Sequence, residues 1–204
     1  MPRGCWILRI DRRLGVVMEN TASALELKEE GLRLFREGLY KEATAAFEHA
    51  QEMFAGDGNE AEAAEMANNL GVIRRMQGKW DEAIAVLEEA RAAFVRLGDR
   101  GREAQTLGNL GGLYASVGER DKAKECLRQA ADIFAESGDT QHQAETLLAL
   151  GVQAWKTGDR SGGLATYEAG LHALQNPTAG QKTLRSLLSL RARLLGGRKE
   201  AAGR

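Results

Sequence analysis

The sequence predicts an all-α protein, a right-handed α-solenoid of helix–turn–helix repeats that ends in a C-terminal capping helix. The first observation behind this prediction is a pair of glycine series that recur every forty residues. They are Gly31, Gly71, Gly111 and Gly151, followed seven residues later by Gly38, Gly78, Gly118 and Gly158. The second observation is the composition, which has two prolines in 204 residues and favours helix. A period of this length is typical of arrays whose repeats bury their apolar faces on their neighbours.

Residues 1–22 form an N-terminal extension that does not share the repeat pattern. One hypothesis is that Met18 is the true start and that residues 1–17 are upstream sequence read as protein. The alternative is that the apolar residues of this segment form an extra element that docks on the first repeat or on a second chain. These residues are Trp6, Ile7, Leu8, Ile10, Leu14, Val16 and Val17.

Four repeats are expected within residues 23–178, with bounds at 23–60, 61–100, 101–140 and 141–178. Their helix pairs are 23–37 with 40–55, 61–77 with 80–97, 101–117 with 120–136, and 141–157 with 160–174. The second glycine series should end the first helix of each repeat, where a residue with φ > 0 is needed. Between repeats, Gly58-Asn59, Gly98-Asp99 and Gly138-Asp139 supply a helix stop and a cap for the next helix.

The small residues of the first helices are expected to face alanines of the second helices, so that the two helices approach closely. Bulky residues fill the remaining space in two columns, Phe47, Leu87, Leu127 and Tyr167, and Phe54, Phe94, Phe134 and Leu174. The fourth repeat has Gly163 and Gly170 where alanine is expected. A glycine costs about 0.5–1 kcal/mol in a helix interior, so this repeat is predicted to be the loosest.

A capping helix is predicted at residues 179–195, after Asn176-Pro177, because the last apolar face of an array has no following repeat. Residues 196–204 are predicted to be a disordered basic tail. The net charge of −1 is unevenly distributed, with +3 on residues 1–17, +4 on residues 191–204 and −8 on residues 18–190. An acidic body repels phosphate backbones, so nucleic acid is not an expected partner. The basic ends either contact an acidic surface or are solvated tails.

The cellular location expected from the sequence is the cytoplasm. No apolar run reaches the length that a membrane span requires. Arg9, Asp11 and Arg12 interrupt the apolar residues near the N-terminus, where a signal peptide would have its core. Cys5 and Cys126 are too far apart in sequence to form a metal or redox motif.

Catalytic chemistry is not expected. His49, His142 and His172 fall in different repeats without a metal-binding spacing, and no nucleophile is paired with a base. We therefore predict neither an enzyme nor a cofactor or metal site.

The columns resemble the tetratricopeptide repeat in its forty-residue form. The second repeat carries the pattern at Leu70-Gly71, Gly78, Trp80, Ala83, Leu87 and Ala90, and the resemblance extends over residues 23–195. It implies that the first helices line a concave groove that holds a peptide or helix of another protein. It also implies that an Asn before the Leu-Gly pair can bond the backbone of a bound peptide, and Asn69 and Asn109 occupy that position. The alternative is that these amides only solvate the helix surface.

The predicted groove residues share the exposed side of the first helices. They are Asn68, Asn69, Val72, Arg75, Gln105, Asn109, Gly112, Glu145 and Trp155. Gly108 and Gly112 either leave a hollow for a partner side chain or relieve crowding. Trp155 either anchors a partner or packs under the capping helix. The sequence therefore predicts a non-catalytic adaptor that binds a protein segment, and the alternatives are a homo-oligomerising module and a sensor of a short signalling peptide.

Overall fold

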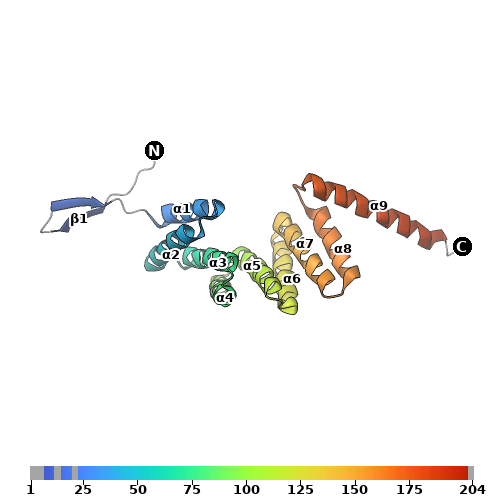
Figure 1. Cartoon of the computed structure of the whole chain (residues 1–204), viewed down its shortest axis with the longest axis horizontal. Helices are drawn as coiled ribbons and strands as arrows, with labels where there is room; N and C mark the ends of the chain where they lie inside the picture. The colour runs from blue at the N-terminus through green and yellow to red at the C-terminus, as the bar shows by residue number, and fades with distance from the viewer. Residues whose placement is uncertain (1–6, 12–14, 20–22, 202–204) are drawn as a thin grey trace. The chain divides into compact units, whose positions relative to one another are not determined.

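The computed structural model of the chain describes residues 7–11, 15–19 and 23–201, and it divides into two compact units, one ending at Asp99 and the other beginning at Arg100 (Figure 1). Among these residues, the first unit holds β1 (Ile7–Asp11), β2 (Gly15–Glu19), α1 (Ala24–Arg36), α2 (Tyr40–Gly56), α3 (Glu60–Met76) and α4 (Trp80–Leu97). The second unit holds α5 (Arg100–Ser116), α6 (Arg120–Ser137), α7 (Thr140–Lys156), α8 (Arg160–Ala173) and α9 (Ala179–Ala201). Each unit stacks helix–turn–helix repeats, which confirms the predicted fold class for the helices.

The N-terminal extension contains a feature that the all-α prediction lacks. Strands β1 and β2 form an antiparallel hairpin in which Ile7 pairs with Glu19 and Asp11 with Gly15. Both strands contain β-branched residues, which favour extended backbone. An extra element therefore exists before the first repeat, and Met18 lies within it, paired with Leu8. The hypothesis that the native chain starts at Met18 stays a prediction.

The turns between helices follow a period of twenty residues. Glycines from Gly38 to Gly158 occur at this spacing, and all of them have φ between 70° and 98°. The members at the middle of each repeat are the second glycine series, so the predicted need for φ > 0 is confirmed. Polar caps then start the following helices. The side chains of Asn59, Asp139 and Asp159 each accept a hydrogen bond from a backbone N–H in the first turn.

The first three repeats bring their two helices together by placing a glycine under a bulky side chain. A Cβ atom added to Gly31 would lie 2.6 Å from Phe47, and one added to Gly71 would lie 2.6 Å from Leu87. A Cβ atom added to Gly111 would lie 2.7 Å from the side chain of Leu127. These distances are too short for a real contact, so the absence of a side chain is what allows the helices to pack. These glycines therefore lie under the bulky column, whereas we expected them to face the alanines of the second helices.

The fourth repeat packs differently from the prediction. A Cβ on Gly163 would lie 2.6 Å from the backbone N of Trp155, and one on Gly170 would lie 2.8 Å from the carbonyl O of Ala144. The two glycines therefore let the backbones of α7 and α8 touch, and they leave no loose space between the helices. We predicted looseness from helix propensity alone, and the structure corrects this expectation at both positions.

The capping helix is longer than predicted. Helix α9 runs from Ala179 to Ala201, whereas the sequence predicted a helix ending at 195 and disorder over 196–204. Arg198, Lys199 and Ala201 are favourable helix residues, so the helix continues past Gly196-Gly197. Residues 202–204 lie outside the described part of the chain. Helix α9 touches the repeats through Leu188, which packs against the core of Ala144, Leu171 and Leu174.

Candidate functional site

The candidate site is described unit by unit as the side of the first helices, α1 and α3 in the first unit and α5 and α7 in the second, that carries the predicted residues. We call this side the first-helix face of its unit. Helix α3 illustrates why this side is available: Leu70, Gly71 and Ile73 are buried against neighbouring helices, whereas Asn69 and Val72 remain half-buried. The residues of this face in the first unit are Leu25, Lys28, Glu29 and Leu32 on α1 and Glu65, Asn68, Asn69, Val72, Arg75 and Met76 on α3. Those in the second unit are Gln105, Gly108, Asn109 and Gly112 on α5 and Glu145, Val152 and Trp155 on α7.

An ion-pair cluster joins the two first helices of the first unit. The ammonium group of Lys28 on α1 lies 2.7 Å from carboxylate oxygens of both Glu62 and Glu65 on α3. Each of the three side chains has a quarter or less of its surface exposed. Burial alone lowers the pKa of Lys28, but its hydrogen bonds to the two carboxylates together outweigh burial and raise that pKa above its ordinary value. The cluster therefore fixes α1 against α3.

This cluster was absent from the predicted groove residues. The two contacts connect residues 34 and 37 positions apart, in different repeats. Glu65 occupies the same repeat position as Gln105 and Glu145, forty and eighty residues later, both of which were predicted. The cluster could have been found by searching for opposite charges at facing positions of neighbouring repeats, because the first helices of neighbouring repeats lie side by side.

The first unit also displays apolar side chains on this face. Leu25 is 56% exposed, Leu32 36% and Met76 52%. They flank the half-buried Asn68, Asn69, Val72 and Arg75, which were predicted to bind a partner. The face of α1 and α3 therefore combines exposed apolar groups with amides and charges, the mixture typical of the cores and rims of protein interfaces.

Helix α5 of the second unit has an open surface at Gly108. A Cβ built on this glycine would meet no atom within 4 Å. Relief of crowding is therefore not its role, and a hollow that receives a partner side chain stays a prediction. Gln105 is exposed, and Asn109 and Gly112 are half-buried on the same helix.

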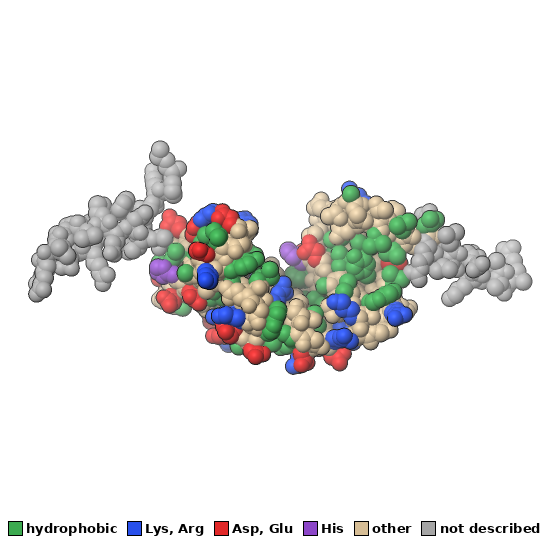
Figure 2. All heavy atoms as spheres, in the orientation of Figure 1, with side chains coloured by type: hydrophobic (Ala, Val, Ile, Leu, Met, Phe, Trp, Pro, Cys, Tyr) green, Lys and Arg blue, Asp and Glu red, His purple; other side chains and the backbone are tan. Residues whose placement is uncertain are grey.

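Helix α7 carries the largest exposed side chain of the predicted set. Trp155 is 49% exposed, and its ring lies 5.9 Å from the guanidinium of Arg160 on α8. This exposure rules out burial of Trp155 under the capping helix. Val152, one turn earlier, is 40% exposed, and the carboxylate of Glu145 accepts a hydrogen bond from Gln141 at 2.6 Å. Figure 2 shows hydrophobic atoms gathered over α7, α8 and the first half of α9.

The predicted residues do not all belong to one unit. Asn68, Asn69, Val72 and Arg75 lie in the first unit, and the remaining five lie in the second. The first-helix face is therefore described separately for each unit. A continuous ladder from Asn69 to Asn109 stays a prediction.

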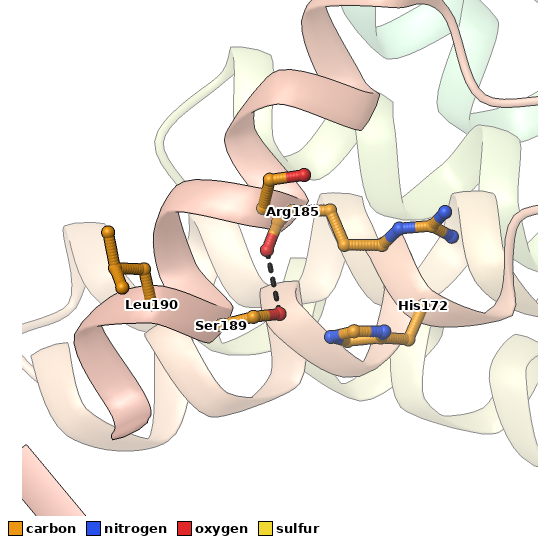
Figure 3. A pocket seen from close by; sticks show the side chains of 5 residues that line it. His172, Arg185, Ser189 and Leu190 are labelled. Carbon is orange, nitrogen blue, oxygen red and sulfur yellow. Dashed lines mark hydrogen bonds between the residues drawn. The ribbon is translucent and has the colours of Figure 1, made fainter. Parts of the chain in front are cut away.

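A surface hollow of about 330 Å³ lies between α8 and α9, and we did not predict it from the repeat pattern. His172 of α8 and Arg185, Ser186, Ser189 and Leu190 of α9 line it (Figure 3). The Ser189 hydroxyl donates a hydrogen bond of 2.9 Å to the carbonyl O of Arg185, so it stabilises its own helix. The guanidinium and the imidazole extend along the same side of the hollow, which gives it a basic wall.

The described residues hold few groups that suit covalent or metal chemistry. Within them, no cluster of three or more His, Cys, Asp or Glu side chains has the arrangement of a metal site. Cys126 on α6 is buried and is not part of a disulfide among the described residues. Among the helices that the structure describes, each is too short or too polar for a membrane crossing.

Comparison with protein families gives one result. The family model described as "Tetratricopeptide repeat" matches residues 21–95 and 62–136, which together cover more than half of the chain. No curated protein sequence matches the chain.

Solved structures with similar folds include BtubC (BKLC) from P. vanneervenii, with a TM-score of 0.67 and 25% identity over 76% of this chain and 67% of that one. The apo form of RapI matches with a TM-score of 0.72 and 13% identity, over 86% of this chain and 51% of its own. Aspartyl phosphate phosphatase F from Bacillus subtilis matches with a TM-score of 0.70 and 12% identity, over 74% and 39%. This chain thus spans about half the length of RapI and less than half the length of the phosphatase. At these identities, both likenesses concern the fold alone.

Proposed function

Because this chain belongs to the tetratricopeptide repeat family, we propose that it is a non-catalytic, cytoplasmic adaptor whose first-helix face binds a peptide or helix of another protein. The observation that carries the proposal is the contrast between the two sides of the first helices. One side is closed by glycines under bulky residues, and the other leaves amides, apolar side chains and an exposed tryptophan accessible. A surface of this composition suits a protein segment better than a small charged ligand.

Each kind of group has a distinct task in this proposal. The amides of Asn69 and Asn109 both donate and accept hydrogen bonds, so they can hold the backbone of a partner whatever its sequence. The open surface at Gly108 receives a bulky partner side chain. Trp155 anchors the partner, because large aromatic side chains at interfaces often carry more than 2 kcal/mol of binding free energy.

The ion-pair cluster contributes by keeping the face rigid before the partner arrives. Lys28 holds Glu62 and Glu65 at 2.7 Å each, so α1 and α3 keep their spacing. A preformed face loses less conformational entropy on binding than a mobile one, which raises affinity without any added contact.

The test selects peptides from a displayed random library on the full chain and then measures their affinities by calorimetry. We expect the Asn69→Ala/Asn109→Ala variant to bind a selected peptide at least about tenfold more weakly, since each lost hydrogen bond costs about 1 kcal/mol. Trp155→Ala should weaken binding by about thirtyfold. Helix content, followed by circular dichroism, should stay unchanged in both.

Gln129→Ala is the matched control, because Gln129 carries the same kind of amide on α6, a second helix. Its affinity for the peptides should equal that of the wild type. If the library yields no binder, or if every binder tolerates the first-helix variants, the proposal is wrong.

A further inference from the structure

The hollow between α8 and α9 is a concave surface within the second unit that the proposed function does not use. Its volume of about 330 Å³ lies at the lower end of the range of about 300–1,000 Å³ that is typical of small-molecule pockets. Figure 3 shows the guanidinium of Arg185 and the imidazole of His172 at one end of the hollow and Leu190 at the other. A ligand that matches this lining has a hydrogen-bond acceptor on one side and an apolar group on the other.

Arg185 supplies the positive charge of the hollow. The residue is half-buried, and its guanidinium makes no ion pair or hydrogen bond with any residue that the structure describes. By contrast, Arg74 and Arg91, which are also half-buried, each pair with a glutamate of α4, at 3.8 and 3.6 Å. Arg75 is unpaired like Arg185, and it lies on the first-helix face, where the proposed function places a partner. A guanidinium carries five N–H donors, so Arg185 has donors available for a ligand in the hollow.

The charged residues beside the hollow leave this positive charge in place. Glu168 is half-buried on α8, one turn before His172, but it is not part of the lining. Lys182 is exposed on α9, one turn before Ser186, and it is also outside the lining. These two charges have opposite signs, so Arg185 determines the charge that a ligand meets in the hollow.

Two serines place hydroxyl groups at the hollow. Ser186 and Ser189 donate hydrogen bonds of 3.0 and 2.9 Å to the carbonyl O atoms of Lys182 and Arg185, one turn earlier on α9. These carbonyls lie inside a helix, where they also accept backbone hydrogen bonds. The hydroxyls can therefore turn away from them and donate to a ligand instead.

We propose that this hollow binds a carboxylate that carries an apolar group. The planar guanidinium of Arg185 holds both carboxylate oxygens side by side, and the imidazole of His172 and the serine hydroxyls add donors. Leu190 packs against the apolar group. The single guanidinium suits a monoanion better than a phosphate dianion. A small-molecule acid and the C-terminus of a peptide both present this chemistry.

Titration of the full chain with N-acetyl-leucine, followed by heteronuclear NMR, tests the proposal. Saturable shifts should be confined to the end of α8 and to α9, with a Kd of roughly 1 mM for so small a ligand. N-acetyl-leucine amide has the same apolar group without the charge, and it should bind at least about tenfold more weakly. A longer peptide with a C-terminal leucine then separates the two sources. Equal or tighter binding of that peptide assigns chain ends, and its exclusion assigns small-molecule acids.

Substitutions locate the binding at the hollow. Arg185→Gln should weaken binding of N-acetyl-leucine at least about tenfold, because it removes the charged donors. Arg185→Lys keeps the charge but loses the planar pair of donors, so it should bind severalfold more weakly than the wild type. Helix content, followed by circular dichroism, should stay unchanged in both, since Arg185 pairs with no described residue. Lys182→Gln is the matched control, because it removes a positive charge from the same helix outside the lining, and it should bind like the wild type.

Several results would overturn the proposal. They are equal binding of the acid and the amide, tighter binding of inorganic phosphate, and the absence of saturable shifts at α8 and α9. An equal loss of affinity in Lys182→Gln and Arg185→Gln would show general attraction to a basic helix, which would also overturn it. Peptides selected on the first-helix face should still bind the Arg185→Gln variant, so this inference and the proposed function can fail separately.

Discussion

The third and fourth repeats share one unit and one pattern, yet they bring their helices together by different means. In the third repeat, Gly111 lies under the side chain of Leu127, and Leu107 and Leu110 are fully buried. In the fourth, a Cβ on Gly151 would lie 2.7 Å from the carbonyl O of Gly163 and the backbone N of Tyr167. The leucines of α7 that correspond to Leu107 and Leu110 remain half-buried.

The difference shows that a short distance between helices is not the same as a large buried apolar surface. When two backbones touch, few side chains fit between them. Leu147 and Leu150 of α7 accordingly stay half-buried, whereas Leu107 and Leu110 of α5 are fully buried. The fourth repeat thus gains close backbone packing and buries less of its leucine surface.

Among the substitutions that test this contrast, Gly151→Ala should cause the largest loss of stability. The added methyl group would meet backbone atoms that cannot turn aside, so we expect the free energy of unfolding to fall by about 3 kcal/mol. Urea denaturation of the full chain followed by circular dichroism measures it. An unchanged or increased stability would show that α7 and α8 are farther apart than described.

Gly111→Ala should cost less, about 1–2 kcal/mol, in the same urea experiment. The closest atom to its Cβ belongs to the side chain of Leu127, which can rotate, whereas the backbone of α8 cannot. The alanine also improves helix propensity by up to about 1 kcal/mol, which offsets part of the clash. A loss equal to that of Gly151→Ala would contradict the distinction between the two repeats.

Asp139 lies at the junction of the two repeats and provides a pH test. The backbone N–H of His142, followed by its imidazole, stabilises the carboxylate and lowers the pKa of Asp139. A lowered folded-state pKa adds stability above the ordinary carboxyl pKa, and this stability disappears as pH falls through the folded value. Asp139→Ala should destabilise the chain by about 1 kcal/mol at pH 7 and by less near pH 3, measured by urea denaturation. A constant difference across this range would exclude the charged cap.

Gly108→Ala should have the smallest effect and the opposite sign. Its Cβ would enter open space, so the gain in helix propensity should raise the free energy of unfolding by about 0.5–1 kcal/mol. Urea denaturation of this variant beside Gly111→Ala compares two glycines on one helix that differ in their surroundings. Destabilisation by Gly108→Ala would mean that the surface at this position is closed.

The features that could be predicted from sequence are those with local causes. A residue with φ > 0 and a cap such as Asn59 depend on a few neighbouring residues, so the turns at Gly38 and Gly78 were identified. The Lys28 cluster was missed because it joins two repeats, and the hairpin was missed because residues 7–19 share no period with the array. Gly163 was misjudged because propensity describes one helix and says nothing of how near the next helix can come.

The candidate site shows the same division. The positions of the candidate site residues could be predicted from the repeat columns. The exposure of their side chains could not, because it depends on how the helices pack. The choice between an anchoring and a buried Trp155 was open in the sequence; its 49% exposure excludes burial, and anchoring of a partner stays a prediction. Asn69 and Asn109 either bond the backbone of a bound peptide or only solvate the helix surface. Binding measurements on the Asn69→Ala/Asn109→Ala variant must separate these interpretations.

The turns repeat every twenty residues, but the columns of glycine and bulky residues repeat every forty. Insertions of forty and of twenty residues should therefore have different effects on the fold. A duplicated block of forty residues inserted at Asp99 would add both helices of a repeat, so its glycine would keep its bulky neighbour. A block of twenty would restore the turn geometry but add a single helix, which carries only the glycine or only the bulky residue of such a pair. Growth by duplication is thus restricted to whole repeats by packing, although the backbone alone would accept half of one.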